Sequence, residues 1–219
     1  MAYNSIMEEL RLFSYKMTHD TGFAPNPFHG FLTLANCKPC IRKCKNKSDW
    51  IAGFSSSQLN NDKVGEERLV YLMKVTNKIT YDEYWNNNEY ECKKPKLESK
   101  HIFEKAGDNI YKPVSLNKKT FEQINNKFHD ESQKEHDLSG NFVLVSNHFY
   151  YFGGSPIQIP LEVRPDIPKG QSSNGNLTHD SEIKKKFIHY IESNYTKGLI
   201  NMPDGMKSEI NPAKVNKCV

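Results

Sequence analysis

The pattern of hydrophobic and polar positions predicts a chain built mainly from short strands. The clearest buried strand is the apolar run RLVYLMKV at residues 68–75, and DWIAGF at 49–54 predicts a second one. Residues 11–17 (RLFSYKM) and 141–151 (NFVLVSNHFYY) predict two more. Gly53 lies inside one of these runs and indicates a bulge or a close approach. The segments between the runs are rich in Gly, Pro, Asn and Ser, so we expect loops there.

Helical patterns are fewer than strand patterns. Thr80 and Glu83 have the spacing of a capping box, which predicts that a short helix begins at Tyr81. One amphipathic helix is expected over about residues 180–195, from the apolar positions Ile183, Phe187, Ile188, Ile191 and Tyr195.

Other segments carry weaker patterns. The GFLTLA segment at 30–35 fits a strand or a short helix, and the tail beyond Gly198 looks extended and weakly ordered. The polar stretch 116–140 has the helical spacing Phe121, Ile124, Phe128 and is expected to be an insertion or a peripheral helix. Together the patterns predict an α+β fold, with a small, strongly bent sheet or an open barrel and peripheral helices. A length of 219 residues fits a single domain, 1–219, with its core motifs at 11–160.

Composition indicates an aromatic-rich core and a cytoplasmic protein. Only 37% of the residues are hydrophobic, but twelve Phe and eleven Tyr supply large buried surfaces. No run reaches the roughly 18 apolar residues that span a bilayer, and the start lacks the apolar stretch of a signal peptide. The five cysteines are odd in number and crowded, which is not typical of a secreted disulfide framework.

The net charge of +4 permits contact with polyanions without requiring it. Cations concentrate within ten residues, at Lys38, Arg42, Lys43, Lys45 and Lys47. Such a cluster is equally well explained as a solvated face. The interpretation depends on what lies beside it.

The same segment contains Cys37, Cys40 and Cys44 in the spacing C-x2-C-x3-C. Two such thiolates can hold zinc only if further ligands arrive from elsewhere, so no metal and no cofactor is predicted. Cys37 as a nucleophile would need a base, for which His19 and His29 are candidates. The motifs of P-loop, Rossmann, zinc deaminase and serine hydrolase proteins are absent from the sequence.

The stretch from Asp20 to Phe54 is therefore expected to carry the function. Aromatic rings beside cations are the components of base-stacking and phosphate-contacting sites. The residues expected to bind a base or nucleotide are Asn26, Lys38, Arg42, Asp49, Trp50, Asn109 and Tyr151. The candidates for catalysis are Asp20, Asp108, Cys37 and His148. Each ring is also compatible with a place in the core, and each Asp or Asn with a turn.

Several segments in order resemble the nucleotide modification associated domain 2 family. They are SYKMTHDTGFAPNPFHGFLTLANCKPCIR, DWIAGF, LVYLMKV with TYDEYW, GDNIY and VLVSNHFYYFG. The resemblance implies a component of prokaryotic or phage systems that modify bases. The family has Gly where this chain has Ser48, which predicts a slightly different turn. A fainter similarity to PUA, ASCH and EVE barrels implies a PUA-like open barrel that binds a base in an aromatic cage.

Three functions follow as alternatives. The first is a recognition module for a nucleotide or nucleic acid, DNA rather than RNA, in a modification or phage-defence system. The second is an enzyme that acts on a nucleotide or modified base with an Asp general base. The third is a structural subunit that contacts other proteins of such a system.

Overall fold

A computed structural model describes residues 9–114, 120–206 and 215. Its strands are β1 (Leu12–Lys16), β2 (Leu32–Leu34), β3 (Trp50–Phe54), β4 (Leu69–Lys74), β5 (Asn77–Thr80), β6 (Tyr111–Pro113), β7 (Phe121–Gln123), β8 (Phe142–Ser146), β9 (His148–Tyr151), β10 (Asn176–Leu177) and β11 (Gly198–Leu199). Its α-helices are α1 (Pro39–Cys44), α2 (Ser57–Asn60), α3 (Tyr81–Asn86), α4 (Ile102–Lys105), α5 (Lys134–Leu138) and α6 (Ser181–Asn194). Short 3-10 turns cover Asn88–Lys93, Glu131–Gln133, Leu161–Val163 and Asp204–Met206.

The main sheet has six strands in the order β10-β1-β3-β4-β9-β11. β1 and β3 are parallel, as are β9 and β11, and the other neighbours are antiparallel. A three-stranded sheet, β2-β8-β5, and a two-stranded sheet, β6-β7, lie beyond it. The α+β class predicted from the sequence is confirmed, and none of the three sheets formed by the described residues closes into a barrel.

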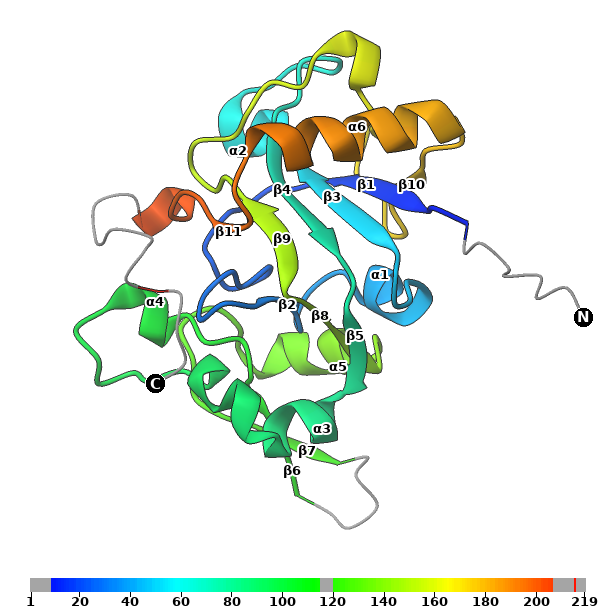
Figure 1. Ribbon diagram of the computed structural model, residues 1–219. Helices are drawn as coiled ribbons and strands as arrows, with labels where there is room; N and C mark the ends of the chain where they lie inside the picture. Colours follow the sequence, from blue (N-terminus) through cyan, green and yellow to red (C-terminus); the bar gives the residue numbers. More distant parts are fainter. Residues whose placement is uncertain (1–8, 115–119, 207–214, 216–219) are drawn as a thin grey trace, which may run out of the picture.

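Side-chain alternation gives the main sheet two buried faces. Trp50, Ala52 and Phe54 of β3 pack with Phe187 and Ile191 of α6, which lies across this sheet in Figure 1. The opposite face belongs to a second cluster, which contains Ile51, Tyr71, Tyr151 and Phe28. Because strand side chains point alternately to opposite faces, one sheet contributes to both clusters.

The main sheet and the three-stranded sheet are joined at two places where one strand directly follows another in the sequence. The chain passes from β4 into β5 and from β8 into β9, so both connections leave one sheet and enter the other. The prediction of a single strand over 141–151 was therefore wrong, because the chain bends at Asn147. At this bend Ser146 Oγ accepts a hydrogen bond from the N–H of His148 at 3.1 Å and donates one to its carbonyl oxygen at 2.8 Å. The chain passes from the three-stranded sheet into the main sheet at this bend.

Most sequence patterns are confirmed at the level of single elements. The strands at 11–17, 49–54 and 68–75 and the helix near 180–195 all form. Thr80 and Glu83 make both bonds of the capping box. The register shifts between Gly53 and Phe54, as a bulge requires, and a Cβ at Gly53 would lie 2.3 Å from the ring of Tyr71.

Three expectations are corrected. Phe121 begins strand β7 and not a helix, because its segment pairs with β6. Ser48 itself adopts φ 75°, so the turn keeps the left-handed conformation without a glycine. The tail is partly ordered, since Gly198 and Leu199 pair with β9; residues 207–214 and 216–219 lie outside the described residues.

Candidate active site around Cys37

Cys37 lies in a sharp turn between β2 and α1. Its φ is 55° and that of Lys38 is 40°, a left-handed conformation that non-glycine residues rarely adopt and that is concentrated at functional sites. The N–H of Cys37 donates to Asp137 Oδ1 at 2.6 Å, and its carbonyl accepts from Arg42 Nε at 2.8 Å. Pro39 then begins α1, where its fixed φ suits the first helical position. The backbone of Cys37 is thus held on both sides.

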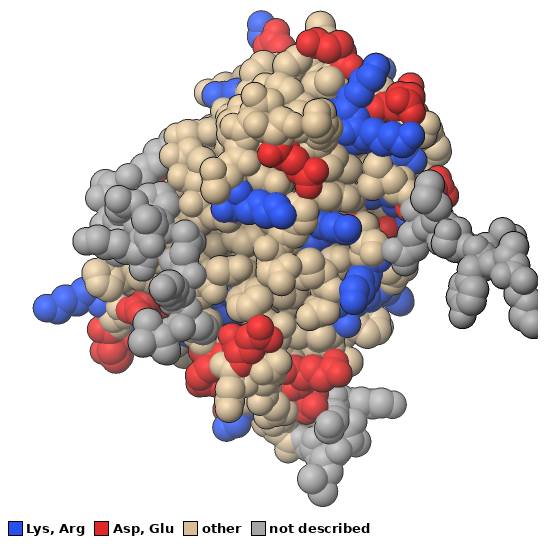
Figure 2. All heavy atoms as spheres, viewed as in Figure 1, with Lys and Arg blue, Asp and Glu red and all other residues tan. Residues whose placement is uncertain are grey.

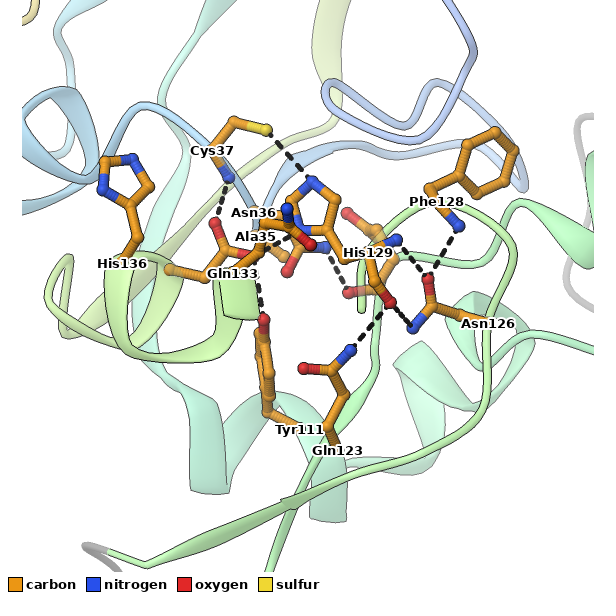
Figure 3. A network of polar contacts seen from close by, with 12 residues as sticks. Ala35, Asn36, Cys37, Tyr111, Gln123, Asn126, Phe128, His129, Gln133 and His136 are labelled. Atoms are coloured by element: carbon orange, nitrogen blue, oxygen red, sulfur yellow. Dashed lines mark hydrogen bonds and ion pairs between the residues drawn. The ribbon is translucent and has the colours of Figure 1, made fainter. Parts of the chain in front are cut away.

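The thiol of Cys37 faces an imidazole that is oriented by a carboxylate. Cys37 Sγ lies 3.4 Å from His129 Nε2, as Figure 3 shows, and His129 Nδ1 lies 2.6 Å from Asp137 Oδ2. His129 and Asp137 are eight residues apart, whereas Cys37 lies 92 positions from His129 in the chain. The arrangement resembles that of a catalytic triad, in which a nucleophile lies within hydrogen-bond reach of a base that a third group orients.

Asp137 is fully buried, and both of its carboxylate oxygens are engaged. Oδ1 accepts the N–H of Cys37, and Oδ2 also accepts the hydroxyl of Tyr111 at 2.8 Å. The hydrogen bond from His129 Nδ1 therefore places the imidazole tautomer with Nε2 toward Cys37. Asp137 links the thiol residue and the base in one network.

The electrostatics favour a charged imidazole. Burial lowers the pKa of His129, but its contacts with Asp137 and Cys37 outweigh burial and raise the pKa to about 9. At neutral pH an imidazolium therefore faces the sulfur. The charge of this imidazolium lies next to the side chain of Cys37.

Side chains near His129 fix its backbone. Asn126 Oδ1 accepts the N–H groups of Phe128 and His129, and Asn126 Nδ2 donates to the His129 carbonyl at 2.9 Å. Gln123 Nε2 donates to the same carbonyl at 2.8 Å. The ring of Phe23 meets the imidazole edge-on, with 4.9 Å between centroids. These hydrogen bonds hold the imidazole of His129 in one position, although it lies on a loop without regular secondary structure.

The side chain of Arg42 lies next to Asp137 and is fully buried from solvent. Its guanidinium donates to the carbonyls of Asp137 at 2.6 Å and Phe142 at 2.9 Å, and to the hydroxyl of Tyr81. A Cβ at Gly140 would lie 2.5 Å from Arg42 Nη1, so glycine makes this approach possible. Arg42 ties α1 to α5 and β8, and in this structure its donors bind protein and not a surface phosphate.

A cavity of about 490 Å³ opens at the thiol. Such a volume lies within the usual range for a small-molecule site. Its walls come from the turn that carries Cys37, from α5 and from the segment before β10, through Cys37, Lys38, Pro39, Cys40, His136, Gln171, Ser172 and Ser173. Cys37 is partly exposed and lines this cavity, and the half-buried Lys38 lies in the same wall.

The same three side chains could be considered as metal ligands, because their donor atoms all lie within 4.8 Å of one another. The hydrogen bonds favour the triad. Both oxygens of Asp137 already bind protein donors, and one of them orients His129 through Nδ1, as second-sphere carboxylates do. Only Cys37 and His129 would remain as ligands. Cys40 and Cys44 are exposed and add nothing that the structure brings close.

The other predicted catalytic residues lie away from Cys37. The carboxylate of Asp20 is buried, bonds to the hydroxyl of Tyr151 and accepts the N–H of Asp204. His148 lies 3.0 Å from Glu192 on the outer side of β9, with its ring against Trp50. Burial lowers the pKa of His148. Their catalytic roles stay predictions.

Asn26, Asp108 and Asn109 belong to a second buried network. Lys93 is fully buried and donates to Asn26 Oδ1 at 2.7 Å and to the Phe31 carbonyl at 2.8 Å. Asp108 accepts hydroxyls from Thr33 and Tyr84, each at 2.7 Å. Asn109 Nδ2 donates to the Tyr84 carbonyl at 2.9 Å. These groups hold the loop before β2 and do not line the Cys37 cavity.

The remaining nucleotide-binding candidates do not form one cage. Trp50 and Tyr151 are buried on opposite faces of the main sheet, in different clusters. Asp49 binds the guanidinium of Arg11 at 2.6 and 2.7 Å. Lys38 alone shares the cavity with Cys37.

His129 and Asp137 were missed by reasoning from sequence. They lie in the polar stretch 116–140, which was interpreted as an insertion or a peripheral helix, and the expected bases for Cys37 were His19 and His29. His129 is one of eight histidines and meets a residue 92 positions away. Only the fold selects it, since no local motif marks this pairing.

Comparison with known proteins gives one match. A family model described as nucleotide modification associated domain 2 matches residues 9–210. Searches of curated proteins and of solved structures found no match. Across the described residues, no helix has the length and apolarity needed to cross a membrane.

Proposed function

Because this chain belongs to the nucleotide modification associated domain 2 family, we propose that it is a thiol enzyme that acts on a nucleotide or a modified base. The observation that carries the proposal is the contact of Cys37 Sγ with His129 Nε2 at 3.4 Å, with His129 held by Asp137. Recognition of the nucleotide, the first function expected from the sequence, becomes the binding step of this enzyme.

The geometry fits acyl transfer at a carbonyl carbon carried by the nucleotide. The Cys37 thiolate attacks that carbon and forms a C–S bond. As the C–N or C–O bond to the leaving group breaks, His129 donates its Nε2 proton to the leaving nitrogen or oxygen. Water then gives a proton to His129 and attacks the thioester, which releases the acid and restores the thiolate. Asp137 keeps the imidazole in place through both steps.

The cavity supports a nucleotide as the bound molecule. Its volume of about 490 Å³ accommodates a small molecule, and Lys38 provides a cation near the thiol. Burial lowers the pKa of Lys38, whereas the neighbouring Cys37 raises it. A phosphate bound beside this ammonium would favour its charged form, so anion binding and Lys38 are mutually supportive.

Thiol reactivity tests the proposal without knowledge of the substrate. The three cysteines Cys37, Cys40 and Cys44 can be followed in one molecule by iodoacetamide alkylation and mass spectrometry. At pH 7 we expect Cys37 to react about tenfold faster than the exposed Cys40 and Cys44, because of these three only Cys37 has an imidazole within hydrogen-bond reach among the described residues.

The variant His129→Gln should bring Cys37 to the rate of the other two cysteines. A variant at the exposed His136, on the opposite side of the cavity, serves as control and should leave Cys37 fast. Equal rates for all three cysteines in the unmodified protein would refute the thiolate–imidazolium pair.

Turnover can then be sought with a panel of nucleotides and modified DNA that carry amide or ester groups, read by mass spectrometry. A covalent adduct on Cys37 or a released acid supports the acyl chemistry. Loss of that product in Asp20→Asn but not in Cys37→Ser would instead favour the Asp general base expected from the sequence. Specific retention of partner proteins by both variants, without product, would favour a structural subunit of a modification or defence system.

A further inference from the structure

Three cavities lie in a row along the segment 169–173. The first is the Cys37 cavity, and the second, of about 360 Å³, shares Gln171 with it. The third, of about 660 Å³, shares Lys169 and Val64 with the second. A ligand that left the thiol along this segment would therefore pass from one hollow into the next.

The middle cavity lies where the parallel strands β1 and β3 end. Lys16 is the last residue of β1 and Thr18 follows this strand, and Ser56 and Ser57 follow the end of β3. In open α/β sheets ligands bind beyond the carboxyl ends of parallel strands, where successive loops diverge. The same arrangement occurs here in an α+β fold, at the strand pair nearest the Cys37 turn.

Most of the unpaired charge along the row is positive, and the one unpaired carboxylate among the described lining residues is that of Asp166 in the third cavity. The carboxylate of Asp62 is bound by Arg68 at 2.7 Å, and that of Glu67 by Lys16 at 2.7 Å and Arg164 at 2.8 Å. Lys38, Lys63 and Lys169 have no carboxylate within 4.0 Å among the described residues. One such ammonium lies at the first cavity, one at the second, and one between the second and third.

Arg164 lies in the wall of the third cavity, and one of its hydrogen-bond donors has no partner among the described residues. Its side chain is about nine-tenths buried, and in the described part of the chain its Nη1 has no hydrogen-bond partner. This nitrogen is itself buried, and Arg164 Nη2 binds Glu67, so Arg164 is not among the groups that can meet a ligand in the cavity. On the face drawn in Figure 2, basic and acidic side chains are both spread over the surface.

We propose that these three cavities form one groove for a single-stranded polynucleotide, whose phosphates lie at Lys38, Lys63 and Lys169. The inference rests on the proposed thiol function and names its substrate as a nucleotide within a strand and not a free nucleotide. The strand would run past the carboxyl ends of β1 and β3 and bring one modified residue to Cys37.

Binding can be measured by fluorescence anisotropy with labelled 12-nucleotide strands of DNA and RNA, and with thymidine monophosphate as competitor. Because each neutralised phosphate of a single strand contributes about −0.7 to the slope of log K against log salt, three contacts predict about 15- to 20-fold weaker binding at 200 mM than at 50 mM salt. A strand should bind at least about tenfold more tightly than the monophosphate. The two polymers distinguish DNA from RNA.

The variant K63A/K169A should weaken strand binding about tenfold and flatten the salt dependence. The matched control K100A/K112A removes two exposed lysines outside the three cavities and should leave both unchanged. Equal binding of strand and monophosphate, or equal binding by the two double variants, would overturn the groove.

The same titration with Cys37→Ala separates this inference from the proposed reaction. Strand binding with an unreactive Cys37 in the unmodified protein would remove the thiol enzyme and keep the groove. A reactive Cys37 in a protein that binds no strand would keep the thiol enzyme and remove the groove.

Discussion

Two buried polar networks hold the two sides of the segment that leads into α1, and they differ at one end. The Lys93 network joins Asn26, Asp108 and Tyr84 and is enclosed by protein. The Asp137 network passes through His129 to the sulfur of Cys37, which lines a cavity. Both are rich in charge and hydrogen bonds. The Asp137 network is the candidate active site because one of its members, Cys37, lines a cavity. Buried polar groups alone do not indicate an active site.

Their electrostatics differ in the same way. Burial lowers the pKa of Lys93 and raises that of Asp108, while each opposes the shift of the other. Such a pair is a structural feature whose loss is costly. In the Asp137 network the contacts outweigh burial and raise the pKa of His129 to about 9. In that network the positive charge of His129 lies next to the sulfur of Cys37, the proposed nucleophile.

The largest expected effect is the loss of the nucleophile. Cys37→Ser should lower turnover of any substrate found in the panel by about 10⁴-fold or more, since a triad without its nucleophile retains little activity. Cys40→Ser, in the same cavity wall, should change turnover less than twofold. Steady-state kinetics measures both, and similar losses in the two variants would contradict the assignment.

Matched Asp→Asn changes compare the two networks directly. Asp137→Asn should lower kcat by about 10² to 10⁴-fold, because the amide no longer holds the reactive tautomer of His129. Asp108→Asn should leave kcat of the folded protein unchanged while lowering its stability. If Asp108→Asn reduces kcat as much as Asp137→Asn at equal folded fraction, the distinction between the networks fails.

Lys93→Met tests the enclosed network alone. Its removal leaves Asp108 buried without a cation, so we expect the free energy of unfolding to fall by about 3 kcal/mol. Lys100→Met, at an exposed position, should change it by less than about 0.5 kcal/mol. Urea unfolding followed by circular dichroism gives both values. An unchanged stability in Lys93→Met would show that the pair contributes no net stabilisation.

The smallest expected effect is on the pH dependence of stability. His129 has a higher pKa in the folded protein, about 9, than in the unfolded chain, about 6.5, so its stabilisation is complete below pH 6.5 and is lost as pH rises through 9. The stability advantage over His129→Gln should therefore shrink across this window. Because the ring is partly exposed and screened, we expect a change of about 1–2 kcal/mol.

Urea unfolding of both proteins at pH 6, 7.5 and 9 provides the measurement. The difference between them isolates His129 from other groups that titrate in this range, Lys93 among them. An advantage that grows with pH would mean that Asp137 and Cys37 do not stabilise the imidazolium.

The sequence by itself determined the elements whose signal is local. Periodic apolar positions located β3, β4 and α6, and Thr80 with Glu83 located the start of α3, because alternation, helical spacing and capping depend on neighbours in the chain. The sequence also selected the segment from Asp20 to Phe54 and placed Cys37 among the catalytic candidates. It could not separate Cys37 from Asp20, Asp108 and His148, since each has a side chain capable of the same chemistry.

Tertiary structure decided which of those side chains meet. The base and the orienting carboxylate come from a polar stretch without strong periodicity, and His129 reaches Cys37 only because α5 packs beside α1. The bend at Asn147 likewise depends on strands that pair across two sheets. Hydrogen bonds between positions about a hundred residues apart leave no pattern in the chain. The sequence therefore offered Cys37 as one of four catalytic candidates, and the fold placed His129 and Asp137 beside it.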